Sequence, residues 1–168
     1  MRSEPDSGGS EVELIGQYLD VQREALLAKT KGLDREQMMQ LHLPSTLTLG
    51  GLLYHLSLAE EDWMEIHFLG QPDRDPFVRA DWDADPNWQF RVPAEMEPEQ
   101  LRQRYLDACD RSRAVVRKAS SLEQLSVKRV RGEHFSLRWV LLHLIEETAH
   151  HAGHADFLRE AIDGNVGE

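Results

Sequence analysis

Cysteine is nearly absent from this sequence, since Cys109 is the only one in 168 residues. A single thiol cannot form an internal disulfide, which agrees with a reducing compartment, and we therefore expect a cytoplasmic protein. The sequence predicts that Cys109 is a small buried side chain rather than a catalytic thiol. With one cysteine there is no Cys-x-x-Cys pair, so thioredoxin chemistry has no support.

Long hydrophobic runs are also absent. No apolar stretch approaches the ~20 residues that a membrane-spanning helix needs, so we expect no membrane partner. The first ten residues hold no apolar segment, which excludes a signal peptide, and residues 1–10 are expected to be a flexible tail. The remaining residues, 11–168, have the length of a single domain, and four tryptophans with 40% hydrophobic residues are too apolar for a disordered chain.

Positive charge is scarce, because 19 Lys and Arg stand against 30 Asp and Glu, a net charge of −11. A protein that wraps duplex nucleic acid needs clustered basic side chains, so nucleic acid is not an expected partner. Three catalytic motifs are missing as well: a Gly-rich phosphate loop, a Gly-x-Ser-x-Gly elbow and His-Glu-x-x-His. Nucleotide-binding folds, serine hydrolases and zincin proteases are therefore not indicated, and a small-molecule substrate is expected.

Hydrophobic periodicity predicts an all-α protein with four long helices. Apolar side chains recur at spacings of three and four in segments that cover about residues 11–31, 47–69, 98–119 and 137–163. Ser136 is expected to cap the last helix and Gly164 to end it. Such helices predict a four-helix bundle, in which metal and cofactor sites are built from side chains that face across the core.

The first two helices are each predicted to bury one apolar stripe. In the first helix the buried stripe consists of Leu14, Tyr18, Val21, Ala25 and Ala28, and the charged face toward water holds Asp20, Arg23 and Glu24. In the second helix the buried stripe consists of Leu49, Leu52, Leu56, Ala59, Trp63 and Ile66.

Residues 70–98 are predicted to form a long loop between the second and third helices, since the periodicity stops there and five prolines occur. Loops of this length are uncommon in compact domains and tend to be lids or binding loops. The loop contains the aromatic residues Phe77, Trp82, Trp88 and Phe90, which argue against disorder. Two interpretations stay open: a lid over a site, or a strap whose aromatic side chains complete the core.

Four of the eight histidines lie in the last helix. At about 100° per residue, His151 lies in the middle of its apolar face, with Glu147 and His154 on a shoulder roughly 40° away. His150 is roughly 120° off and is predicted to face water. Burying a carboxylate and an imidazole together is costly unless something neutralises them, and a divalent metal ion does so. We therefore predict that Glu147 and His151 are metal ligands.

His55 is the predicted third ligand, because it flanks the apolar stripe of the second helix at the edge where a neighbouring helix packs. Two nitrogens and one carboxylate match catalytic zinc sites that leave a position open, and also the facial triad of non-haem iron. One alternative is that Glu147 and His151 form a hydrogen-bonded pair in the core without a metal.

Other arrangements of the histidines also stay open. His150 and His154 share a spacing of four, but their use would turn the apolar stripe away from the core, so this pair ranks second. His154 is the candidate catalytic residue, which could orient a ligand or shuttle protons because imidazole titrates near physiological pH. The alternatives to an enzyme are a non-enzymatic metal-binding or stress-response module that dimerises, and a metal-free histidine network with an interaction role.

Two segments of the sequence carry a resemblance to a known family. One is Ser-Thr-Leu-Thr-Leu-Gly-Gly-Leu-Leu-Tyr-His-Leu at residues 45–56, followed by Trp63; the other covers residues 136–164 and contains Glu-Glu-Thr-Ala-His-His. They resemble the DinB/YfiT-like superfamily, and more narrowly its mini-circle branch, which is related to the metal-binding domain of mycothiol-dependent maleylpyruvate isomerase. The likeness covers nearly all of the chain after residue 10.

The resemblance implies a DinB-like four-helix bundle with a metal ion held by one His of the second helix and two ligands four residues apart on a later helix. In this sequence those positions are His55, Glu147 and His151. It also implies a divalent metal, commonly zinc or nickel, and a low-molecular-weight thiol. Zinc is favoured, and iron is an alternative because the ligand set also matches the facial triad. The implied activity is metal-dependent S-transfer, isomerisation or hydrolysis of a small molecule, and a homodimer is compatible with the sequence.

Overall fold

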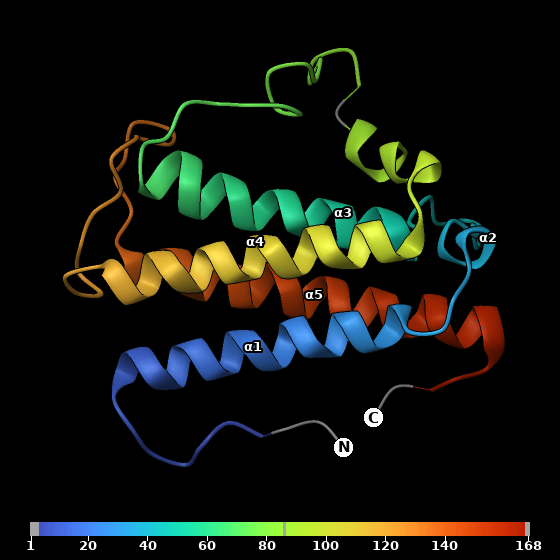
Figure 1. Cartoon of the computed structure of the whole chain (residues 1–168), viewed down its shortest axis with the longest axis horizontal. Coiled ribbons are helices and arrows are strands. Elements are labelled where there is room, and N and C mark those ends of the chain that lie inside the picture. Colours follow the sequence, from blue (N-terminus) through green and yellow to red (C-terminus); the bar gives the residue numbers. More distant parts are fainter. Residues whose placement is uncertain (1–3, 86, 167–168) are drawn as a thin grey trace.

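The computed structural model describes residues 4–85 and 87–166, so residues 1–3 of the expected tail, Pro86 of the expected loop and residues 167–168 lie outside it. The long helices are α1 (Glu11–Thr30), α3 (Leu49–Glu60) with its continuation η1 (Glu61–Phe68), α4 (Pro98–Lys118) and α5 (Leu137–Asp163), and a short α2 covers Arg35–Met38. They lie lengthwise beside one another, with α1 packed mainly on α5 and α3 on α4 (Figure 1). The predicted all-α four-helix bundle is therefore confirmed.

Side chains at the helix ends set the bounds of α1 and α5. Ser10 accepts a hydrogen bond from the backbone N–H of Glu13, and the Glu13 carboxylate accepts one from the backbone N–H of Ser10. Ser136 accepts a hydrogen bond from the backbone N–H of Trp139, and Gly164 ends α5 with a φ of 76°, a left-handed conformation that favours glycine. The predicted cap and stop of the last helix are confirmed.

The predicted buried face of α1 is partly wrong. Tyr18 is 53% exposed, whereas Leu19 and Leu26 are buried together with the predicted Val21. Arg23, predicted to face water, is 3% exposed and donates two hydrogen bonds to the buried carboxylate of Glu60, at 2.7 and 2.6 Å. This bidentate ion pair with α3 turns the charged side of α1 inward at that point.

The sequence predicted one regular second helix. In the structure this helix changes into the π-helix η1 at Glu61. Glu61 and Glu65 of η1 are buried, and Arg74 donates to both of them at 2.7 and 2.8 Å. Arg111 of α4 donates to Glu65 at 2.6 Å. π-helical turns are frequent at functional sites, and this one continues the helix that carries His55.

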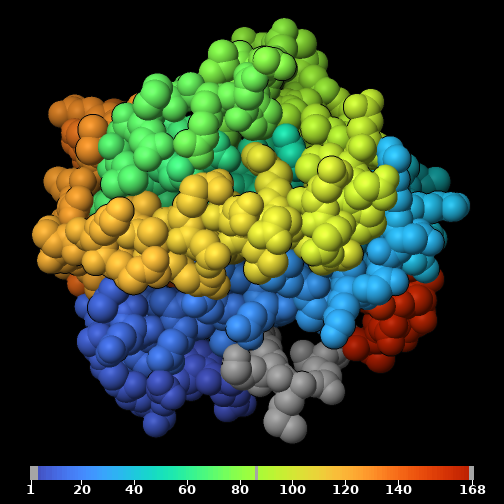
Figure 2. All heavy atoms as spheres, in the orientation of Figure 1, coloured from blue at the N-terminus to red at the C-terminus, as the bar shows by residue number. Residues whose placement is uncertain are grey.

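The segment between η1 and α4 contains two short 3-10 helices, η2 (Trp88–Phe90) and η3 (Val92–Glu95). It arches over α3, and in the space-filling view this segment and α4 cover most of that helix (Figures 1 and 2). Phe77, Trp88 and Phe90 pack partly buried against the core, while Trp82 is 41% exposed. The long loop predicted between the second and third bundle helices is therefore confirmed, and its aromatic side chains hold it against the bundle.

Candidate metal centre

Three metal-ligating side chains converge from two helices. His55 of α3 and Glu147 and His151 of α5 offer ligand atoms that all lie within 4.8 Å of one another. The Nε2 atom of His55 is 2.9 Å from Oε1 of Glu147, and the Nε2 atom of His151 is 3.4 Å from the same oxygen. The structure thus brings together the three residues that the sequence singled out, and ligation of a metal ion stays a prediction.

Gln89 fixes the tautomer of His55. Its Oε1 atom lies 3.0 Å from Nδ1 of His55, and because an amide oxygen only accepts hydrogen bonds, this ring nitrogen is the donor. The ring of Phe90 stacks on the same imidazole, with centroids 5.0 Å apart. In a neutral imidazole the remaining nitrogen, Nε2, then carries a lone pair and points at Glu147.

This donor set fits a divalent metal ion. A neutral imidazole whose Nδ1 atom is the donor turns a lone pair toward the negatively charged oxygen of Glu147, which is unfavourable unless a cation lies between them. A divalent ion accepts the imidazole nitrogens and the carboxylate oxygen together, and two nitrogens with one oxygen are a ligand set of catalytic zinc sites. The second nitrogen of each ring is held by a neighbouring side chain, as in metal-bound histidines.

His154 supplies that neighbour for His151. The two Nδ1 atoms lie 3.3 Å apart, so one ring donates and the other accepts. Burial, followed by the charges of His150 and His151, lowers the pKa of His154, which favours its neutral form. His154 lines a different cavity from the one beside His55, together with His42 and Phe157. It therefore lies behind His151, in a position to orient that ring.

When the Nε2 atoms carry protons instead of facing a metal ion, hydrogen bonds from His151 and then from His55 lower the pKa of Glu147 well below its usual value, against the opposing effect of burial. Its carboxylate is therefore ionised at neutral pH, as a metal ligand must be. The side chains of His55, His151 and Glu147 are 16%, 12% and 30% exposed, respectively. The three side chains are therefore largely shielded from water.

A cavity of about 150 Å³ opens beside His55 and Glu147. Its lining comes from α3, η1, the segment that covers α3, and α5: His55, Leu58, Ala59, Asp62, Trp63, Phe77, Trp82, Gln89, His143 and Glu147. The sequence placed Trp63 in the core stripe, but its ring contributes to this wall. Gln89 and Asp62 were missed, since Gln89 lies in a segment without periodicity and Asp62 looked like one more surface carboxylate.

The remaining histidines of α5, His143 and His150, lie outside the candidate metal centre. His150 is exposed, as predicted. His143 is half-buried and stacks on Trp139 with centroids 5.0 Å apart, while Trp139 itself is 40% exposed. Within the described part of the chain, His55, Glu147 and His151 are the one group of three or more such side chains close enough to share an ion.

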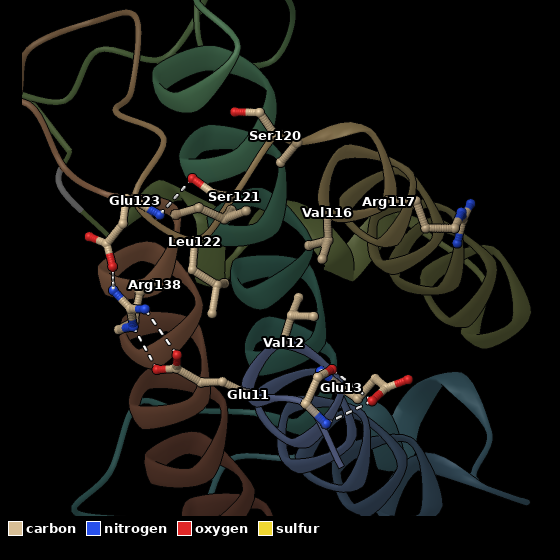
Figure 3. A pocket seen from close by; sticks show the side chains of 13 residues that line it. Glu11, Val12, Glu13, Val116, Arg117, Ser120, Ser121, Leu122, Glu123 and Arg138 are labelled. Atoms are coloured by element: carbon tan, nitrogen blue, oxygen red, sulfur yellow. Dashed lines mark hydrogen bonds and ion pairs between the residues drawn. The ribbon is translucent and has the colours of Figure 1, made fainter.

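A cavity of about 700 Å³ lies at one end of the bundle and shares no residue with this centre. Val12, Val116 and Leu122 point into it, and Arg138 on its edge pairs with Glu11 and Glu123 (Figure 3). Arg138 precedes Glu147 by nine residues, or roughly 14 Å along the helix axis.

No described helix is both long and apolar enough to cross a membrane.

Comparisons with known proteins agree with this architecture. The family model described as Mycothiol-S-transferase matches residues 14–164. A solved structure described as the crystal structure of the conserved protein of a locus from Enterococcus faecalis superposes with a TM-score of 0.72. That protein is 12% identical in sequence, the match covers 94% of this chain and 100% of that chain, and the likeness shows the fold alone. No curated protein matches this chain.

Proposed function

This chain belongs to the mycothiol S-transferase family, a DinB-like family, and from that premise we propose that it is a metal-dependent enzyme acting on a low-molecular-weight thiol. In this proposal His55, Glu147 and His151 hold one divalent metal ion, for which zinc is favoured over nickel or iron. The reaction is transfer of the thiol sulfur to a small electrophile, with isomerisation or hydrolysis as variants of the same chemistry. A reducing cytoplasm, which keeps such thiols reduced, is the matching compartment.

The observation that carries the proposal is the orientation of two imidazole Nε2 atoms toward one carboxylate oxygen, at 2.9 and 3.4 Å, with a cavity alongside. Three protein ligands leave a coordination position free, which is the arrangement of catalytic rather than structural zinc sites. A divalent ion lowers the pKa of a thiol or water that it binds, so that a nucleophile is available at neutral pH.

Three side chains of this protein orient the two candidate histidine ligands or shield them from water. Gln89 accepts the Nδ1 proton of His55 and keeps its Nε2 atom toward the ion site. His154 acts as a positioning residue through its contact with Nδ1 of His151. Phe90 stacks on the His55 ring, and we expect this contact to limit the access of water to that imidazole. Among the described residues that line the cavity there is no serine, threonine or cysteine, so the nucleophile is expected from the thiol substrate.

Elemental analysis of the purified protein tests the metal assignment. We expect about one zinc or nickel ion per chain, lost in His55→Ala, Glu147→Ala and His151→Ala. His150→Ala, which alters an exposed histidine on the same helix, is the matched control and should keep the metal. Full metal content in His151→Ala would contradict the assignment. Thiol transfer to a chromogenic electrophile, compared between metal-loaded and chelator-treated protein, then tests the reaction.

A further inference from the structure

The cavity beside the candidate metal centre is lined by acidic side chains but by no lysine or arginine among the described residues. Asp62 and Glu147 are the carboxylates in its wall, and none of the described residues that line it is a lysine or an arginine. The titratable groups besides these carboxylates are His55 and His143. A small molecule that enters therefore meets aromatic rings, imidazoles and carboxylates, and no fixed positive charge from the chain.

The arginines of the covering segment are held by carboxylates outside this cavity. Arg74 binds Glu61 and Glu65, at 2.7 and 2.8 Å. Arg79 pairs with Asp75 at 2.8 Å, and Arg91 pairs with Asp85. Each of these guanidinium groups has an acidic partner, and none of these arginines lines the cavity.

Asp62 lies seven residues after His55, in η1, and lines the same cavity about 10 Å further along the helix axis. Its Oδ2 atom is 3.3 Å from Nε2 of His67, and its side chain is 35% exposed. Trp63, Phe77 and Trp82 form the apolar part of the wall around it. The cavity wall thus holds His55 and Glu147 of the candidate metal centre and also the carboxylate of Asp62, which His67 contacts.

Charge balance gives Asp62 a role in substrate choice. Glu147 and a bound thiolate together would balance the two charges of a divalent ion, so the carboxylate of Asp62 leaves the occupied cavity negative. A second carboxylate on the thiol molecule would then be repelled, whereas hydroxyl or amide groups would donate hydrogen bonds to Asp62. We propose that Asp62 is a specificity-determining residue, which selects thiols that carry hydroxyl or amide groups and rejects thiols that carry a carboxylate. This inference rests on the proposed function, because it needs the thiol to bind at the triad.

The test compares two thiols that differ almost solely in one group, N-acetylcysteine and N-acetylcysteinamide. Their affinities for the zinc-loaded protein are measured by calorimetry at pH 7, without turnover. We expect the amide to bind roughly tenfold more tightly than the acid, the ratio for two unit charges about 10 Å apart at an effective dielectric constant of about 20. In Asp62→Asn this ratio should fall to between about one and three.

Two control variants separate the charge of Asp62 from its structural contacts. His67→Gln keeps the carboxylate but removes its partner, and should keep the preference for the amide. Asp107→Asn makes the same change of charge at an exposed position on α4, where its carboxylate accepts a hydrogen bond from Gln103, and should leave the ratio unchanged. Zinc content and the melting temperature, measured for every variant, show that each is folded and loaded.

The outcomes distinguish this inference from the proposed function. A protein that binds zinc but neither thiol contradicts the proposed function. A protein that binds both thiols equally, or an Asp62→Asn variant with the wild-type ratio, contradicts the role of Asp62 and leaves thiol binding standing. A flattened ratio in Asp62→Asn alone supports the proposal.

Discussion

Gly51 approaches the backbone of Phe90 so closely that a Cβ atom on it would lie 2.9 Å from the Phe90 carbonyl oxygen. Gly51 lies one turn before His55 on α3, and Phe90 follows Gln89, which binds the ring of that histidine. The absence of a side chain at Gly51 therefore lets η2 settle on α3 and bring both residues onto His55. This contact connects a glycine in a helix to the orientation of a candidate metal ligand.

Replacing Gly51 by alanine is expected to push η2 away from His55. Since the Cβ would meet backbone atoms, η2 must shift, and the hydrogen bond from His55 to Gln89 should lengthen or break. We expect zinc affinity to fall severalfold and the melting temperature to drop. Gly16→Ala is the control, because a Cβ at Gly16 meets nothing within 4 Å and alanine favours a helix by about 1 kcal/mol. Equal zinc affinity in Gly51→Ala and wild type would refute this link.

Gln89→Leu removes the acceptor of the His55 Nδ1 proton while keeping a side chain of similar size. Loss of such a partner typically costs about 10–100-fold in metal affinity, so we expect weaker zinc binding in a competition assay with a chelating dye. Gln89→Glu keeps an acceptor oxygen and should bind zinc much better than Gln89→Leu. If both variants bind zinc like the wild type, the orientation of His55 does not depend on this contact.

The pair Glu147 and His151 could be predicted from the sequence because both lie on one face of a single long helix, where angular position follows directly from spacing. His55 could be predicted as a partner because it borders the apolar stripe of a neighbouring helix. Gln89 could not, since it reaches His55 from a segment without periodicity, 34 residues along the chain. No local pattern encodes which side chain of such a segment will point at the site.

The buried face of α1 shows the same limit in the fold. Arg23 looked like part of a water-facing charged side, and its burial depends on Glu60, which lies 37 residues away. Hydrophobic periodicity is read from each helix separately, and it assigns a charged residue to the surface. The burial of Glu61 and Glu65 in η1 has a similar origin, because arginines from outside the helix pair with them. The four helices, whose apolar patterns are local, could be predicted with nearly correct bounds.

Breaking the buried pair between Arg23 and Glu60 should strongly destabilise the bundle. Glu60→Ala leaves a guanidinium that is 3% exposed without its bidentate partner, and such a loss costs about 3–5 kcal/mol in free energy of unfolding. Urea denaturation of variant and wild type measures this. Asp75→Ala, which breaks the exposed pair with Arg79, should change stability by at most about 1 kcal/mol. Similar costs for the two variants would argue against the importance of the buried pair.

The free energy of unfolding should decrease in acid, because the carboxylate of Glu65 becomes protonated. Burial alone would raise the pKa of this carboxyl, but hydrogen bonds from Arg111 and Arg74 outweigh it and lower the pKa below its usual value. A group whose pKa is lower in the folded state stabilises the fold above its unfolded pKa, near about 4.3, and loses that contribution as the pH falls through the folded pKa. The free energy of unfolding should therefore decline below about pH 4.5. In Glu65→Gln this decline should be shallower, and an unchanged slope would contradict the assignment.

The thiol of Cys109 should be unreactive toward alkylating reagents in the folded protein. Burial, followed by the charge of Glu60, raises the pKa of its thiol to about 12, and the side chain is 1% exposed. The reactive thiolate is then scarce at neutral pH, and alkylating reagents cannot reach the sulfur. We expect iodoacetamide to label Cys109 rapidly in urea and negligibly in buffer, and Cys109→Ala to retain thiol-transfer activity at some cost in stability. Fast labelling of the native protein, or a folded Cys109→Ala variant that keeps its metal but loses activity, would make this thiol a participant. That result would overturn the proposal that the nucleophilic sulfur comes from the substrate.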